Sequence, residues 1–521
     1  MMVRVFSRAV ALLCLGAVLS RPASAQSLGT ISFPNSGSPS AQAPFIRGML
    51  LLHSFEYPSA ATAFREAQKA DPGFALSYAG EALTYTHPVW DQQDTVAARA
   101  VLAHLAPTSA ERRAKARTLR EQLYMDAVEA LYGAGSKPRR DTLFAAAMER
   151  IVVAYPADDE AKVLHALALL GLNQGVREEG SYMRAGAIAE DVLRRNPDHP
   201  GAAHMVIHAF DDAVHAPLGL WAARAYSKIA PQAPHAQHMT SHIFLAMGMW
   251  DDVVSQNIIA SGHDHTRWQA GHYTMWLGYG YLQQGRYDAA RAHLMHLRTN
   301  AGQALPQGTR LSLVSMRGAY LMTTERWTDS MTAWSFTPIA LPYFRALDAF
   351  VTGYAALKTG KRARAEEIAV ALAGEKPADP GTDEESDSKV IRILTLQLRA
   401  AIAAARGQVD SAVTMALDAA RMEDALPLEF GPPSIPKPTH ELAGEILLEA
   451  GRPVEAQREF TRALELAPGR SRSLIGLARA ASRAGDRAVA VAAARELLRN
   501  WHSADADVPE RAEMERLLKG G

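Results

Sequence analysis

Histidines recur at a fixed interval in the middle of this chain. His204 and His208 are repeated at His238 and His242, each at the same distance along the sequence. The members of each pair are four positions apart, which places both side chains on one face of a helix. Nine of the 18 histidines lie within residues 204–272. Because imidazoles bind transition metals and exchange hydrogen bonds with ligands, this region is predicted to hold the functional site.

The four repeated histidines are candidate ligands of one metal ion. Packed helices lie roughly 8–10 Å apart and an imidazole nitrogen binds zinc at about 2.0–2.1 Å, so two neighbouring helices can share an ion. Zinc, copper and iron all accept such ligands. Asp211, Asp212 and His215 follow His208 closely and are expected to complete the coordination sphere or to orient an imidazole. Direct hydrogen bonding of a ligand and simple polar burial remain open alternatives.

The elements that must position these histidines are short helical repeats. Alternating segments with a 3.6-residue period and no convincing β-alternation predict an all-α chain. Near the C-terminus, Gly485 and Ala490 repeat Gly451 and Ala456 at the interval that separates the histidine pairs. This period resembles that of the tetratricopeptide (TPR) repeat, a helix-turn-helix unit of about 34 residues. The resemblance implies an α-solenoid that forms a right-handed superhelix with a concave groove.

In TPR proteins, the first helix of each hairpin lines the groove. Register with that family places His235, His238 and His242 at repeat positions 2, 5 and 9, and His204 and His208 at positions 5 and 9 of the preceding repeat. These positions commonly face a bound ligand in the family. The resemblance therefore implies that all five side chains face the groove.

Two further groups are candidate groove residues. His53 and His87 are also one repeat interval apart, and Glu81 is expected on the same helix as His87. The last group lies at the end of the proline-rich run of residues 426–438 and just after it, and is expected either to contact a ligand from the far end of the groove or to form only a capped first helical turn. Its members are Lys437, His440 and Glu441.

The domain organisation follows from composition and repeat register. A proline-rich segment is expected to lie on the solenoid as a strap, with a plain linker as the alternative. The expected parts are a signal peptide (1–25), a flexible leader (26–43), a TPR-like α-solenoid with divergent repeats (44–425) containing an exposed acidic loop (376–388), the strap (426–438), a C-terminal TPR pair (439–502) and a C-terminal tail (503–521).

Charge and cysteine content restrict the function. The chain has 55 basic and 55 acidic residues, a balance that argues against nucleic acid as a partner. Two arginines, an apolar run and small residues near Ala25 predict a cleaved export signal, so we expect a periplasmic or secreted protein with no membrane span. Cys14, the only cysteine, lies in that signal. A metal site in the mature chain must therefore use nitrogen and oxygen ligands.

Four segments together resemble a family of bacterial exported TPR proteins for which no activity is established: residues 53–90, 204–224, 233–254 and 429–452. The chain has no HExxH, GxSxG or P-loop motif. The leading hypothesis is an exported TPR scaffold whose groove binds a peptide, a protein partner or a small molecule. The alternative is a metal-dependent hydrolase or oxidoreductase, in which Asp212 or Glu81 moves protons.

Overall fold

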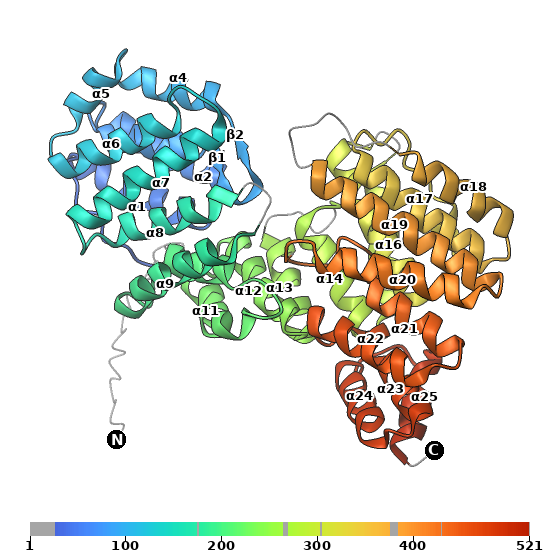
Figure 1. Ribbon diagram of the computed structural model, residues 1–521. Helices are drawn as coiled ribbons and strands as arrows, with labels where there is room; N and C mark the ends of the chain where they lie inside the picture. Colours follow the sequence, from blue (N-terminus) through green and yellow to red (C-terminus); the bar gives the residue numbers. More distant parts are fainter. Residues whose placement is uncertain are drawn as a thin grey trace, which may run out of the picture.

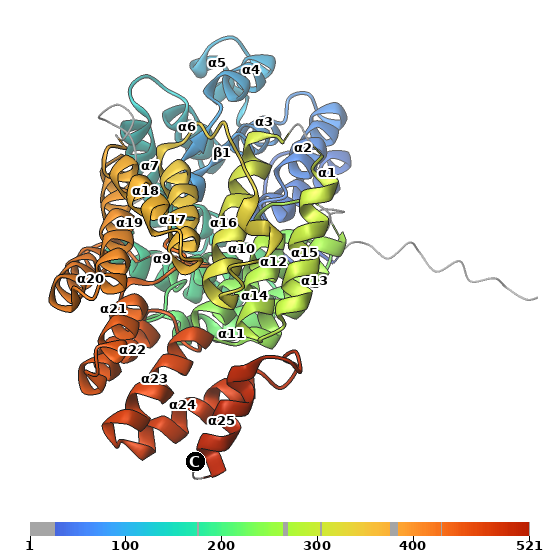
Figure 2. The ribbon, with the colours of Figure 1, turned by 90° about the vertical axis from the view of Figure 1, so that its right-hand side faces the viewer.

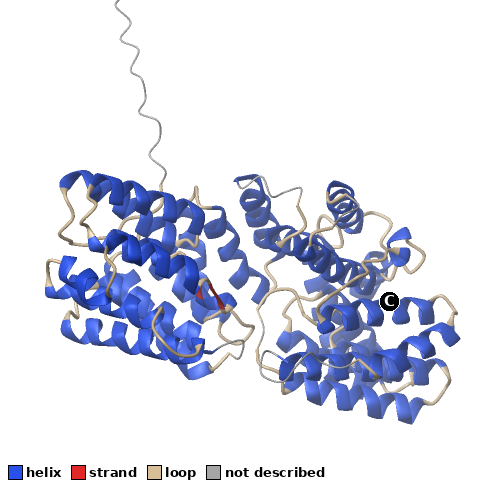
Figure 3. Cartoon of the chain, turned by 90° about the horizontal axis from the view of Figure 1, so that it is seen from above, coloured by secondary structure: helices blue, strands red, loops and turns tan. Residues whose placement is uncertain are grey.

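The protein consists almost entirely of helices, stacked as antiparallel pairs (Figure 3). The computed structural model describes residues 27–173, 177–263, 269–302, 305–375, 384–428 and 430–519. Within these ranges the strands form a single hairpin of two residues per strand. The predicted all-α solenoid of TPR-type repeats is confirmed. The predicted signal peptide lies outside the described residues.

The described part of the first half of the chain contains thirteen helices, the β-hairpin and two 3-10 turns, labelled η. They are α1 (Pro39–His53), α2 (Tyr57–Ala70), α3 (Ala75–Leu83), β1 (Thr86–His87), η1 (Pro88–Trp90), β2 (Gln92–Gln93), α4 (Thr95–Leu105), α5 (Ser109–Lys115), α6 (Leu119–Leu131), α7 (Lys137–Ala154), α8 (Asp159–Leu170), η2 (Gly171–Asn173), α9 (Glu179–Arg195), α10 (Pro200–Ala209), α11 (Ala216–Ile229), α12 (Pro234–Ala246) and α13 (Trp250–His263).

The second half continues the same stacking. Its elements are α14 (His272–Gln283), α15 (Tyr287–Asn300), α16 (Gln307–Thr324), η4 (Ser330–Ala333), α17 (Pro342–Lys358), α18 (Arg362–Ala373), α19 (Glu384–Ala405), α20 (Val409–Asp424), α21 (Thr439–Glu449), α22 (Pro453–Leu466), α23 (Ser471–Ala484), α24 (Arg487–Asn500) and α25 (Pro509–Lys519). Within the described ranges, no helix combines the length and the apolar character that a membrane crossing requires.

Local sequence explains where the central helices begin and end. Pro200 and Pro234 occupy the first positions of α10 and α12, where a missing N–H costs nothing. Gly248, at the turn after α12, has a φ of +68°, a conformation that glycine adopts without strain. These signals set the two hairpins in register, so their histidines occupy equivalent places.

The expected flexible leader is instead packed against the solenoid. Leu28 and Phe33 are buried in the core, and the Thr30 N–H donates to the carbonyl oxygen of Asp198 at 2.9 Å. Helix α1 already begins at Pro39. The prediction was wrong for residues 27–43 because it weighed their Ser, Gly and Pro content above the apolar side chains between them.

The other non-repeat segments differ in how far the structure describes them. Most of the predicted acidic loop, residues 376–383, lies outside the described residues, and α19 begins at Glu384. Residues 426–428 and 430–438, which we call the strap, pack against the solenoid. Ile435 is buried, and the Tyr343 hydroxyl donates to the Ser434 carbonyl oxygen at 2.7 Å. The C-terminal tail contains a further helix, α25.

The solenoid curves until its last repeats touch its centre. Helices α21–α25 form one end of the molecule, beside the central hairpins (Figures 1 and 2). The indole N–H of Trp250 donates to the Gly469 carbonyl oxygen, and that of Trp501 donates to the Gln283 carbonyl oxygen, each at 3.0 Å. The contacts join segments that lie far apart in the sequence, with separations of 219 and 218 positions.

Candidate functional site

Six histidine side chains from three successive hairpins form one continuous group. They come from the first helices of those hairpins, α10, α12 and α14. Ring centroids of neighbouring members are 4.4–6.2 Å apart. We call the group the histidine cluster, and its members are His204, His208, His235, His238, His242 and His272.

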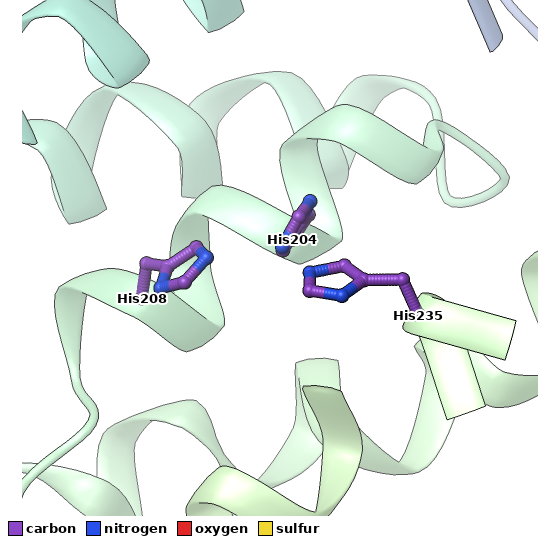
Figure 4. A group of neighbouring side chains, drawn as sticks. All are labelled: His204, His208 and His235. Atoms are coloured by element: carbon purple, nitrogen blue, oxygen red, sulfur yellow. The ribbon is translucent and has the colours of Figure 1, made fainter. Parts of the chain in front are cut away.

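His204, His208 and His235 form the first triad of this cluster (Figure 4). Each offers a ring nitrogen that lies within 4.8 Å of those of the other two. All three side chains are buried, and their Nε2 atoms have no hydrogen-bond partner among the residues that the structure describes. Three neighbouring buried histidines that each have a ring nitrogen without a partner in the described part of the chain are uncommon in a folded protein.

The protonation of His204 is fixed by the protein backbone. Its Nδ1 lies 2.7 Å from the carbonyl oxygen of His53, at the end of α1. Because a carbonyl oxygen only accepts, Nδ1 must carry the proton in the neutral ring, and Nε2 keeps its lone pair. Phe55 packs against the same ring, with the centroids 4.3 Å apart. The hydrogen bond and the contact with Phe55 together fix the orientation of the His204 ring, and with it the direction of the Nε2 lone pair.

His238, His242 and His272 form the second triad. The Asn257 amide nitrogen donates to Ser241 and to a backbone carbonyl, so its oxygen accepts from His238 Nδ1 at 2.7 Å. The carboxylate of Asp211 accepts from His242 Nδ1. Both rings therefore direct the lone pair of Nε2 inward, and these two Nε2 atoms are 3.0 Å apart. Hydrogen bonds of this kind fix the ring orientation of metal-binding histidines.

Burial keeps most members of the cluster uncharged. Loss of hydration is the main cause that lowers the pKa of His204 to about 3, and it lowers the pKa of His208, His235 and His238 well below the usual value. Charge on neighbouring histidines would lower these pKa values further. Neutral imidazole is the form that binds a metal, so the ligands are ready at neutral pH.

An open cavity of about 490 Å³ borders both triads. His235 of the first triad and His272 of the second line it. Most of its remaining wall is aromatic or comes from the β-hairpin and the loop before α14. The wall residues are Phe55, Tyr57, His87, Trp90, Gln92, Gln269, Ala270, Gly271, Tyr273 and Thr274. One histidine of each triad therefore contacts the cavity.

A third group of titratable side chains lies behind the first triad. Glu160 accepts hydrogen bonds from Nε2 of His53 at 2.7 Å and from Nε2 of His199 at 3.1 Å. Burial alone would raise the pKa of Glu160, but the charges and hydrogen bonds of the two histidines lower it to about 2. Glu160 thus anchors His53, whose carbonyl oxygen orients His204.

The structure divides the predicted four-histidine set between the two triads. His204 and His208 join His235, while His238 and His242 join His272. Neither Asp212 nor His215 belongs to these triads.

Asp212 instead pairs with Arg177 at 2.6 Å, and His215 bonds to Asp212 at 2.8 Å. Asp212 was expected to complete the coordination sphere of a metal ion or to orient an imidazole. Its carboxylate is instead engaged in an ion pair with Arg177, which belongs to the preceding repeat.

The N-terminal candidates have different surroundings from those expected. His87 lies on β1 rather than on the helix of Glu81, because α3 ends at Leu83. His87 stacks on Tyr57 in the cavity wall, with centroids 4.0 Å apart. The Glu81 carboxylate accepts from Arg65 and Gln68, and the structure does not bring it to the cluster.

The C-terminal candidates lie apart from the histidine cluster. Lys437 and Glu441 form a buried ion pair at 3.2 Å, and Glu441 also pairs with Arg470 at 2.8 Å. His440 bonds to Glu459 at 2.7 Å and borders a second cavity of about 410 Å³ under the strap. Burial would lower the pKa of His440, but the adjacent carboxylates raise it. Lys437, His440 and Glu441 thus belong to networks of ion pairs within the protein, as structural charged residues do.

His272 is the cluster residue that sequence reasoning undervalued. It follows His238 at the same interval at which His238 follows His204, so the repeat period itself contained the signal. The surrounding residues resembled a loop between repeats. Asp211 was among the carboxylates expected to orient an imidazole, and it does so at His242. Asn257, which orients His238, carried no sequence signal because its role depends on how the helices pack.

No protein-family model matches the chain. No curated protein is similar to it. Among solved structures, the human IFIT1 dimer with PPP-AAAA is similar at 15% identity, with a TM-score of 0.39, 90% of this chain and 96% of that chain being covered.

Yeast Tom70 is similar at 11% identity and a TM-score of 0.28, over 92% of this chain and 95% of that chain. The TPR domain of P58(IPK) is similar at 12% identity and a TM-score of 0.21, over 92% of this chain and 98% of that chain. The fold assignment therefore depends on the helix pairs of this chain itself.

Proposed function

We propose that this protein is an α-solenoid scaffold that holds a divalent transition-metal ion at the first triad and presents it to a small molecule in the adjacent cavity. Two observations carry the proposal: a ring nitrogen of each histidine lies within 4.8 Å of those of the other two, and the three buried Nε2 atoms have no hydrogen-bond partner among the described residues. A scaffold that binds its ligand through metal chemistry combines the two functions that the sequence suggested.

The energetics favour an ion over an empty site. A buried polar atom that lacks a partner costs about 1–3 kcal/mol, and the first triad has three. One ion satisfies all three at once. Lowered pKa values remove the competition of protons for the same nitrogens.

The ligand set supports a reactive site rather than a purely structural one. Three protein ligands leave an open position on zinc, copper or iron, and that position accepts water or substrate. His235 belongs to the triad and also lines the aromatic cavity, so the open position is accessible from there. The size of the cavity favours a small molecule over a folded protein partner. Metal-dependent hydrolysis or oxidation of such a molecule is the activity class that this arrangement supports.

Metal analysis of the mature protein tests the proposal. Purified without chelators and dialysed against Zn²⁺ or Cu²⁺, the parent should retain metal at the first triad, and His204→Ala should lose that ion. His293→Ala is the matched control, because His293 is a partly buried helical histidine bonded to the Thr274 carbonyl oxygen outside the cluster.

Equal metal loss in His204→Ala and His293→Ala would contradict the proposal. Circular dichroism and the thermal midpoint establish that each variant is folded, and His235→Ala provides a second test from the first turn of α12.

A further inference from the structure

We infer that the second triad, His238, His242 and His272, binds a second divalent transition-metal ion, and that the two ions share one small exchangeable anion. The sharing of an anion rests on the proposed function, because the first ion is one of the two that it joins. The binding of the second ion stands on separate residues and is tested separately.

The donor atoms of the second triad have a geometry that suits an ion. Nε2 of His238 and Nε2 of His242 are 3.0 Å apart. With metal–nitrogen bonds of about 2.0–2.1 Å, that separation corresponds to an angle of about 95° at the ion. His272 offers the third nitrogen within 4.8 Å. The triad thus provides three nitrogens for one face of a coordination sphere.

Without a cation, two of these atoms repel each other. Asn257 and Asp211 hold the protons of the two rings on Nδ1, so both Nε2 atoms present lone pairs at close range in buried side chains. A proton or a metal ion between them removes the repulsion. Burial disfavours the proton, because a charged imidazole would lose its hydration among other histidines.

The two triads are neighbours that share an entrance. The rings of His208 and His242 are 6.2 Å apart between centroids, and those of His235 and His238 are 6.1 Å apart. His235 and His272, one from each triad, line the same cavity. A ligand that enters there meets both ions.

Charge balance identifies the class of that shared ligand. Six neutral imidazoles leave the four positive charges of two divalent ions uncompensated. Among the described residues, the carboxylates that accept hydrogen bonds from the triad residues are Asp211, at His242, and Glu56, at the backbone N–H of His235. Two charges remain, and a small anion such as hydroxide compensates part of them in a low-dielectric site.

Titration of the metal-free mature protein with Cu²⁺ tests the inference. We expect two equivalents of copper in the parent and in His293→Ala, and one in each of His204→Ala and His272→Ala. An anion shared by two Cu²⁺ ions couples their unpaired spins, so the parent should give an electron paramagnetic resonance signal weaker than its copper content. Each single-site variant should give a signal equivalent to its one copper.

The outcomes separate the two proposals. If the parent binds one equivalent and His272→Ala still binds it, the second site is overturned and the first site stands. If the parent binds one equivalent that His272→Ala loses and His204→Ala keeps, the first site is overturned instead. Two equivalents with a full paramagnetic signal in the parent overturn the shared anion. His272 lies partly exposed at the start of α14, and His272→Gln repeats the test with an uncharged side chain closer in size.

Discussion

At the scale of single residues, the site is defined by which nitrogen of each imidazole carries the proton. A backbone carbonyl, an amide and a carboxylate fix Nδ1 of His204, His238 and His242, and leave Nε2 for a ligand. The repeat interval predicted four members of the cluster from sequence alone. It did not predict their partition into triads, because that depends on which rings of neighbouring helices face each other.

Protonation of these residues makes the metal-free protein sensitive to acid. A histidine in the unfolded chain titrates near pH 6.5, whereas the folded-state pKa of His204 is about 3. The unfolded state therefore binds more protons as the pH falls, so the stability contribution is fully present above pH 6.5 and is lost progressively toward pH 3. From pH 7 to pH 5, each such histidine should lower the unfolding free energy by about 2 kcal/mol.

Urea denaturation of the metal-free protein at these two pH values measures the loss. The double variant His204→Gln/His208→Gln should show a smaller drop between pH 7 and pH 5 than the parent. An identical drop in both proteins would mean that the cluster histidines do not carry the acid sensitivity.

At the scale of elements, the strap connects the C-terminal repeats to the second triad. Gly431 has a φ of +89°, and a Cβ atom there would lie 2.6 Å from Cζ2 of Trp276. Trp276 in turn packs against His242, with centroids 4.2 Å apart. The proline content of the strap predicted an extended path over the solenoid. Its contact with the histidine cluster was not predictable, since it depends on how far the strap reaches across the inner helices.

Substitution Gly431→Ala should therefore disturb the second triad. The methyl group must displace the strap or Trp276, and we expect the affinity for the second ion to fall by about tenfold, as when groups that orient metal ligands are altered. Gly407→Ala is the matched control, because Gly407 has a φ of +74° and open space around its Cβ position. Titrations of both variants compare the two effects, and equal affinities would exclude a role for the strap.

At the scale of the whole molecule, curvature brings distant repeats to one place. The repeat pattern predicted hairpins and their order. Superhelical curvature arises from small rotations between successive repeats, and these depend on side-chain packing that one sequence does not reveal. As a result, the approach of His53 and Phe55 to His204, and of Trp501 to Gln283, appears only in the structure.

The return contact of the C-terminal repeats should carry measurable stability. Trp501 is fully buried, and its indole N–H donates to the carbonyl oxygen of Gln283, the last residue of α14. Truncation in Trp501→Ala removes that bond and leaves a cavity, so the unfolding free energy of the C-terminal repeats should fall by about 3–5 kcal/mol. Trp221→Ala, at a side chain that is 43% exposed, should have a much smaller effect.

Hydrogen exchange of α22–α25, read by mass spectrometry, checks the location of this loss. In a solenoid each repeat is stabilised mainly by its neighbours, so exchange should accelerate there while α10 and α12 remain protected and keep their metal. Faster exchange throughout the chain would instead mean that the return contact makes the whole superhelix a single cooperative unit. Helix α14 contributes Gln283 to this contact and His272 to the second triad. If the superhelix unfolds as one unit, the first ion should therefore be lost together with the second.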